Sequence, residues 1–483
     1  MLFTPSLLAA LAWGQQCTPA SGDAPAVLRR AAQVIGLSRA APKVLHVSAT
    51  DVVRHDYESD RMYPPFLLQT SRIEEWFDPS TGADRIATLE SMIGANQFKG
   101  PPTLGVRTAS YAVRDTGLVP SAALHGQLLT TRPLNVWATV GDWIAAGDAR
   151  VVGRCEYRDY PRLVLARPGT NGDERLYVDP KTGYPVAFMR TERHYLWGQI
   201  AVEYVYSTWT TVGDAHLPGV AFRLVDGTPA IARTFGDMSL APRDSAPPLA
   251  LPRAITPMQP AVAGFLAPVA PDTIRVSPST VLLRNPDYTE VLTLARDTVF
   301  VFDATQGDMR ARQDSAWIGK LFPGHHAIAV VVTDLAWPHV SGVRYWVAQG
   351  ATIISHRASR AFLDKVVARR WTAAPDLLEE RRSTGRRVAM HFVPVADSLR
   401  LAGGAIMLFA LDGISSEGAL AAFVQGDRFL WASDYIQTLA QPTQYLDEVA
   451  AAVSRMHIDP RRVAAEHLPL SDWATATALV HAP

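Results

Sequence analysis

A stretch rich in proline and alanine divides this chain into two parts with different patterns. Residues 241–271 read "APRDSAPPLALPRAITPMQPAVAGFLAPVAP". Proline has no backbone donor, so such a stretch cannot hold a helix or a central strand and is typical of an extended linker. We therefore expect one domain over residues 40–240 and a second over residues 272–483. A chain of 483 residues, 48% of them hydrophobic, is long enough to build both cores.

The balance of charge excludes one class of partner. Lysine and arginine together number 46, as do aspartate and glutamate. A chain without a net basic field has no general attraction for nucleic acid, so we expect no nucleic-acid partner.

The first residues favour export. Residues 1–14, "MLFTPSLLAALAWG", form a short apolar run that ends in small residues, as a cleaved signal peptide does, although the usual basic start is missing. The run is too short to span a bilayer, and we expect no transmembrane segment. The location predicted is the periplasm or the outside of the cell. Cys17 and Cys155 are the only cysteines, and the sequence allows either a single bridge after export or two buried free thiols.

The first domain is expected to be an antiparallel β domain. Short alternating segments such as "RLVLARP", "ERLYVDP" and "IAVEYVYSTWTTV" are separated by turn signals such as "DPKTGYP". This arrangement weakly resembles the half-barrel sheet of periplasmic lipoprotein carriers. The resemblance implies an unidentified small-molecule or hydrophobic ligand on a concave face; the alternative is a domain whose aromatic residues serve only its core.

The second domain alternates strands with helices. "AIAVVVTD" predicts a strand, "SGVRYWVAQG" a helix and "ATIISH" the next strand. Four segments in order resemble the metallo-β-lactamase-fold hydrolases: "VFVFDAT", "VVVTDLAWPHVSGVRYWVAQGATIISH", "ALDGISSEGALAAFVQGDRFLWASD" and "MHIDPRRVAAEHLP". The resemblance implies an αββα sandwich, so that the whole chain is of the α+β class.

That resemblance also implies where two metal ions would be bound, and most of those ligand positions have changed. The family's histidines at the first metal fall on residues that are not histidine: Asp334, Ala336 and Ser415. At the second metal, the family's aspartate is replaced by Pro338, whereas three positions keep the family's residue: His339, Asp434 and His467.

The surviving trio leaves two functions open. With the dinuclear motif degenerate, we expect either no cofactor or a single divalent metal, with zinc as the first choice, because two histidines and a carboxylate can hold one ion. The prediction is a non-catalytic or ligand-binding family member; the alternative is a mononuclear hydrolase of an ester or lactone. In the simplest alternative, none of the three residues binds a metal. His339 is then only a residue of its loop, Asp434 caps a turn and His467 makes local hydrogen bonds. Glu466 and Asp472 lie near His467 in sequence and could take part in acid–base chemistry.

Overall fold

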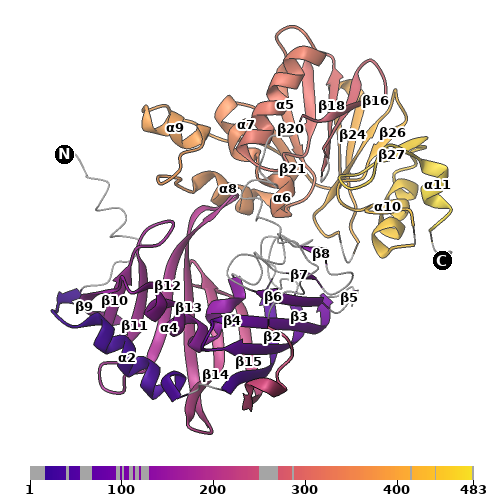
Figure 1. Cartoon of the computed structure of the whole chain (residues 1–483). Helices are drawn as coiled ribbons and strands as arrows, with labels where there is room; N and C mark the ends of the chain where they lie inside the picture. The colour runs from indigo at the N-terminus through magenta and orange to yellow at the C-terminus, as the bar shows by residue number, and fades with distance from the viewer. Residues whose placement is uncertain are drawn as a thin grey trace. The chain divides into compact units, whose positions relative to one another are not determined.

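The protein is described by a computed structural model, in which two compact units are distinguished (Figure 1). The residues described are 17–39, 43–54, 68–93, 98–100, 103–107, 113–114, 119–120, 130–249, 270–285, 288–413, 416–440 and 442–480. The first unit takes its described residues from 17–54, 68–193 and 200–249, and the second from 194–199 and 270–480.

The first unit is built around a thirteen-stranded sheet with antiparallel neighbours. The strand order is β1-β9-β10-β11-β12-β13-β14-β15-β2-β3-β4-β5, and β6 also pairs with β4. The strands are β1 (Cys17–Pro19), β2 (Lys43–Arg54), β3 (Leu68–Asp78), β4 (Ala83–Ile93), β5 (Phe98–Gly100), β6 (Thr103–Arg107), β9 (Arg150–Tyr157), β10 (Tyr160–Arg167), β11 (Glu174–Val178), β12 (Pro185–His194), β13 (Gly198–Val212), β14 (Ala215–Val225) and β15 (Thr228–Pro242). A short separate pair consists of β7 (Val113–Arg114) and β8 (Val119–Pro120).

Side-chain alternation explains why these segments are strands. In β13, Ile200, Val202, Tyr204 and Tyr206 are buried while the residues between them are half-exposed, because successive side chains point to opposite faces of a sheet.

Two helices of the first unit, α2 (Ala24–Val34) and α4 (Val136–Ala146), are joined by a buried contact. The Trp137 indole donates to the carbonyl of Ile35, at 2.9 Å. The Asn135 side chain caps the start of α4 by accepting from the backbone of Trp137, at 3.0 Å, and Gly147 ends the helix with φ of 70°.

A buried arginine holds two carboxylates inside the first unit. Arg233 on β15 is fully buried and pairs with Asp51 of β2, at 2.7 Å, and with Glu75 of β3, at 2.8 Å. Its charge offsets the two carboxylates, which could not otherwise be buried in ionised form without a large loss of solvation.

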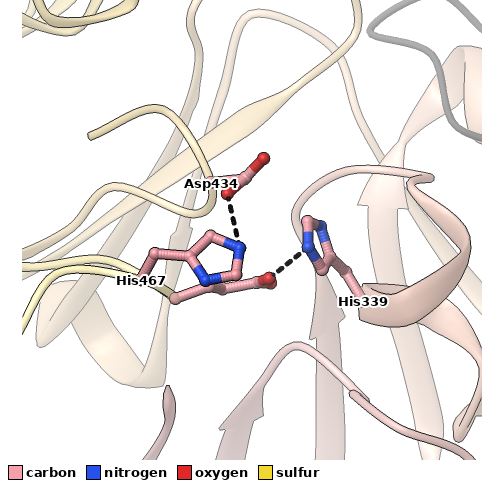
Figure 2. Close-up of side chains that lie close together, drawn as sticks. His339, Asp434 and His467 are labelled. Carbon is pink, nitrogen blue, oxygen red and sulfur yellow. Dashed lines mark ion pairs between the residues drawn. The ribbon is translucent and has the colours of Figure 1, made fainter. Parts of the chain in front are cut away.

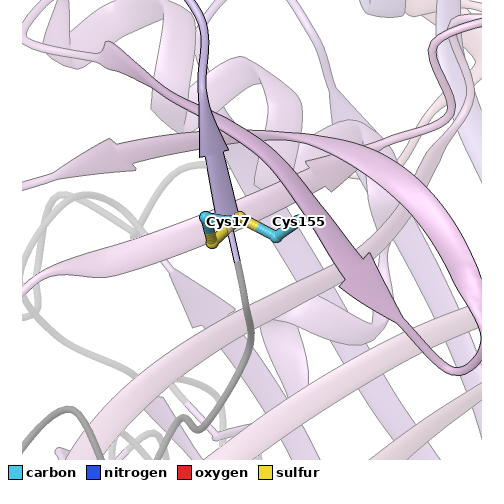
Figure 3. The surroundings of a disulfide bond; sticks show 2 residues. All are labelled: Cys17 and Cys155. Atoms are coloured by element: carbon cyan, nitrogen blue, oxygen red, sulfur yellow. A yellow bond between two sulfur atoms is a disulfide. The ribbon is translucent and has the colours of Figure 1, made fainter.

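A disulfide attaches the start of the described chain to this sheet (Figure 3). Cys17 of β1 lies directly opposite Cys155 of β9 in the antiparallel register, and their Cα atoms are 4.0 Å apart. Of the two arrangements that the sequence allowed, the structure therefore has the bridge, and neither cysteine is free.

The second unit contains two further sheets. The seven-stranded sheet has the order β16 (Asp272–Arg275), β17 (Thr280–Arg284), β18 (Thr289–Ala295), β19 (Thr298–Phe302), β20 (Ala327–Val332), β21 (Thr352–His356) and β22 (His391–Val395). Its strands are antiparallel from β16 to β19 and parallel from β19 to β22. The six-stranded sheet has the order β23 (Ser398–Leu401), β24 (Ile406–Ala410), β25 (Leu420–Val424), β26 (Phe429–Trp431), β27 (Arg462–Ala464) and β28 (Ser471–Asp472), of which β26 and β27 are parallel.

The core clusters show that the two sheets are stacked between helices. One cluster joins the inner faces of both sheets, for example Phe302 on β19 and Leu408 on β24. The outer face of the larger sheet packs on α5 (Asp308–Leu321), α7 (Val343–Gln349) and α8 (Arg360–Ala368). The outer face of the smaller sheet packs on α10 (Gln444–Arg455) and α11 (Trp473–Thr477). Two short helices, α6 (Trp337–Val340) and α9 (Leu377–Ser383), complete the unit.

The observed elements differ from the expected linker at its start. Ala241 and Pro242 still pair with Val44 and Lys43 of β2, and a single 3₁₀ turn, Arg243–Ser245, follows. Residues 250–269 of that stretch lie outside the described part of the chain.

The turn between β12 and β13 belongs to the second unit, although the expected first domain runs through it without a break. Leu196 is buried in the helical core cluster of that unit, and Gly198 lies so close to Trp371 that an added Cβ would be 2.4 Å from the indole. Alternation along the two strands gives no sign that the turn between them would pack elsewhere.

We find no helix in the described residues with the length and hydrophobicity needed to cross a bilayer.

Candidate functional site

The loop after β20 carries the first part of the site. β20 ends at Val332, and α6 begins at Trp337 with Pro338 in its first turn, where a missing backbone donor costs nothing. His339 follows in α6 and is buried. Ala336 contributes only its backbone, whose N–H donates to Asp334 Oδ1 at 2.8 Å.

Asp334 faces His339 directly. Both of its carboxylate oxygens lie 2.9 Å from His339 Nδ1, and its Oδ2 also accepts from the Ser433 hydroxyl at 2.8 Å. Burial alone would raise the pKa of Asp334, but His339 and these donors bring it below its usual value. Asp334 is therefore an ionised acceptor that fixes the orientation of the His339 ring.

The other nitrogen of His339 faces a second carboxylate. His339 Nε2 lies 2.6 Å from Glu466 Oε2, and both side chains are buried. Burial would lower the pKa of His339, but Asp334 and Glu466 raise it well above its ordinary value. The pKa of Glu466 is itself raised well above normal by burial, which the attraction to His339 only partly offsets.

Figure 2 shows the side chains of Asp434 and His467 close to each other and joined by an ion pair. They follow the parallel strands β26 and β27, whose ends lie next to each other. His467 Nε2 is 3.3 Å from Asp434 Oδ1, and the two side chains are 35% and 25% exposed. Gln437 donates to the other carboxylate oxygen of Asp434 at 3.1 Å. Burial raises the pKa of Asp434.

These four side chains could hold a metal ion together. One ligand atom from each of His339, Asp434, Glu466 and His467 lies within 4.8 Å of the other three. Within the described chain, Asp434 Oδ1 and both Glu466 carboxylate oxygens are buried but make no hydrogen bond, although each residue has an imidazole nitrogen close by. Carboxylate oxygens and imidazole nitrogens that converge on one point fit a divalent cation.

A chain of hydroxyls links the site to a buried acid. The Thr333 hydroxyl lies 2.6 Å from the Ser433 hydroxyl and 2.7 Å from Asp303, which also accepts from the Trp431 indole at 2.8 Å. Asp303 is fully buried, and this burial, together with repulsion from Asp334, raises its pKa to about 7.

The structure brings together the three residues that the sequence predicts as a metal-binding trio: His339, Asp434 and His467. The four positions at which the sequence predicts a missing ligand are placed differently: Asp334 orients His339, Ala336 and Pro338 offer no side-chain donor, and Ser415 lies outside the described residues. Sequence reasoning placed Glu466 near His467 but did not include it among the ligands. Its position directly before His467 was the available signal.

Comparisons with known proteins find structural similarity over part of this chain. No family model matches the sequence, and no curated protein matches it. The solved structures that resemble part of the chain include the DIM-1 metallo-β-lactamase, which is 11% identical at a TM-score of 0.34 and is matched over 44% of this chain and 95% of its own. The TMB-1 structure is 10% identical, at a TM-score of 0.33 over 44% of this chain and 95% of its own. A metallo-β-lactamase from Pontibacter korlensis is 9% identical, at a TM-score of 0.33 over 43% of this chain and 95% of its own.

This chain is thus similar in part to metallo-β-lactamases, as its sequence predicts, and a likeness this distant says nothing about its chemistry.

Proposed function

We propose that the second unit holds one divalent metal ion between His339, Asp434 and His467, and that the loaded protein hydrolyses an ester or lactone. The observation that carries the proposal is the convergence of these donors with Glu466 within 4.8 Å, next to carboxylate oxygens that lack hydrogen bonds. Two imidazoles and a carboxylate are a sufficient set for one transition metal.

The charges in the site also favour a cation. The site and its surroundings contain four carboxylates, on Asp303, Asp334, Asp434 and Glu466, and the pKa of three of them is raised. Burial is the main cause of these raised pKa values, because it removes the water that would stabilise a charged carboxylate. A divalent ion would replace the protons that such carboxylates keep, so metal binding should release them.

Each residue has a distinct part in the proposed site. His339 is held by Asp334 at Nδ1, which leaves Nε2 as the donor nitrogen. Asp434 and His467 are partly exposed, so a substrate can approach from their side. A divalent ion in such a place supplies Lewis acidity, which polarises an ester carbonyl or lowers the pKa of a water.

Metal content tests the proposal. The full chain is stripped with a chelator, reloaded separately with zinc and with manganese, and measured by elemental analysis, thermal unfolding and turnover of an aryl ester and a lactone. We expect one ion per chain, and none in His467→Ala, whose partly exposed side chain can be removed without opening the core. His356→Ala is the matched control, because His356 is the last residue of the strand β21 in the second unit and lies outside the cluster.

Three results would contradict the proposal in different ways. Two ions per chain would show that a second site exists. No ion, and no change in the unfolding temperature with either metal, would exclude metal binding and leave the non-catalytic, ligand-binding function that the sequence predicts. One ion per chain without turnover of either substrate would contradict the hydrolase function and support only the metal site.

We also propose that the protein works in an oxidising compartment, outside the cytoplasm. The bridge between Cys17 and Cys155 supports this, because such bonds persist mainly in exported proteins. Thiol labelling of the protein in its native host, without reductant, should leave both cysteines unmodified. Labelling of both in freshly lysed cells would refute it.

A further inference from the structure

The position of Glu466 suggests a part that the three-residue site does not include. We propose that Glu466 is a fourth protein ligand of the ion, an inference that rests on the metal site proposed above. Its ligand oxygen belongs to the group of four donors that lie within 4.8 Å of one another. Only Glu466 and His339 of that group are almost fully buried, so they form the floor of the site.

The backbone fixes Glu466 in this place. Its N–H donates to the carbonyl of Ser433, at 2.9 Å, and its own carbonyl accepts from the N–H of Thr289, at 2.8 Å. Both contacts are independent of the side chain, and they tie residue 466 to the loop that carries Asp434. The carboxylate is thereby directed into the site by the fold rather than by an interaction of its own.

The contact with His339 does not by itself satisfy Glu466. Glu466 Oε2 is 2.6 Å from His339 Nε2, yet neither oxygen of the carboxylate makes a hydrogen bond of normal geometry to a described residue. His339 Nδ1 faces Asp334, so Nε2 is the nitrogen that faces Glu466 and the other donors of the group. An imidazole nitrogen and a carboxylate oxygen that point to the same place can serve together as ligands of one cation.

The fourth ligand has a consequence for the choice of metal. Tetrahedral zinc is saturated by four protein donors, as in structural sites, and keeps no position for a substrate. A six-coordinate ion such as manganese(II) or iron(II) would keep two positions with the same donors. We therefore infer that a six-coordinate ion supports turnover and that zinc occupies the site without supporting it.

The test compares Glu466→Gln with the wild type by calorimetric titration of the metal-free full chain with manganese. Glutamine has the same shape and keeps both backbone contacts, so the fold should persist, and thermal unfolding in chelator checks this. We expect the manganese affinity to fall at least about tenfold. Asp472→Asn is the control, since this carboxylate is exposed and lies outside the cluster, and its affinity should equal that of the wild type.

An unchanged manganese affinity in Glu466→Gln would overturn the fourth ligand and leave the three-residue site in place. Absence of binding in the wild type would instead overturn the metal site itself, so the two failures are distinguishable. Equal turnover by zinc-loaded and manganese-loaded wild type would contradict the inference about the metal. If Glu466→Gln does not fold, a crystal structure of the zinc-loaded wild type decides. A Glu466 oxygen about 2.0–2.2 Å from the ion supports the inference, and a side chain turned away refutes it.

Discussion

The buried acid Asp303 makes the stability of the metal-free second unit depend on pH. Its pKa is raised from the ordinary 3.8 to about 7 by burial and by the neighbouring Asp334. Asp303 accepts from the backbone and the hydroxyl of Thr333 and from the Trp431 indole, and these donors offset only part of the effect of burial.

The sign and size of the effect follow from the two pKa values. Between pH 3.8 and about 7 the unfolded chain releases the Asp303 proton while the folded protein keeps it, so the free energy of unfolding falls as the pH rises. At about 1.4 kcal/mol per pH unit, the loss is about 4 kcal/mol. The raised pKa of Glu466 lowers the free energy of unfolding further at pH values above 4.5, its ordinary pKa. The raised pKa of His339 does the same above pH 6.5, the ordinary pKa of histidine. The lowered pKa of Asp334 acts in the opposite direction only below about pH 4, outside this interval.

Urea unfolding of the metal-free chain, followed by circular dichroism at pH 4.5 and at pH 7.5, should measure about 3 kcal/mol of this loss, because the lower pH already lies above 3.8. In the variant Asp303→Asn, residue 303 cannot titrate. The unfolding transition that this substitution changes is the transition of the second unit. At low pH the variant should be less stable than the wild type by about 1 kcal/mol, because one hydrogen bond to the acid is lost. Its stability should also vary less with pH than that of the wild type, by the contribution of Asp303, while the contributions of Glu466 and His339 remain. The reasoning is refuted if the variant and the wild type show the same pH dependence, or if the metal-free wild type becomes more stable as the pH rises.

Two further predictions concern the first unit. In Arg233→Met the buried carboxylates of Asp51 and Glu75 lose their counter-charge, and the free energy of unfolding should fall by about 3–5 kcal/mol; a loss below 1 kcal/mol in urea titration would show that the arginine is not needed to neutralise them. Cys155→Ser removes a cross-link between residues 138 positions apart, which in the chain-entropy model costs up to about 5 kcal/mol. Reductant should destabilise the wild type by the same amount and leave the variant unchanged, and a reductant effect on the variant would contradict this account.

Local patterns in the sequence predict much of the fold. The alternation in β13 predicts a strand with one buried face, and the apolar run before Thr333 predicts the buried strand β20. The disulfide depends instead on the sheet, because Cys17 meets Cys155 only when β1 adds to the edge of the sheet beside β9. The turn at Leu196 packs in the other unit for a similar reason, since the packing partners are distant in sequence.

The site was predictable in part. His339, Asp434 and His467 could be named because each stands at a recognisable position after a strand. The part played by Glu466 could not be named, because its direction depends on backbone contacts with Ser433 and with Thr289, which is far away in the sequence. Spacing along the chain carries no information on such contacts.

Asp334 holds the ring of the histidine that is proposed to bind the metal. Its carboxylate accepts at once from His339, from Ser433 and from the backbone of Ala336. A histidine at this position could not replace it, because a neutral imidazole has only one acceptor nitrogen. An aspartate at residue 334 is thus suited to holding His339 in one orientation. A protein with Asp334→Asn should accordingly bind manganese more weakly than the wild type, because its amide can accept from only one oxygen and holds His339 less firmly.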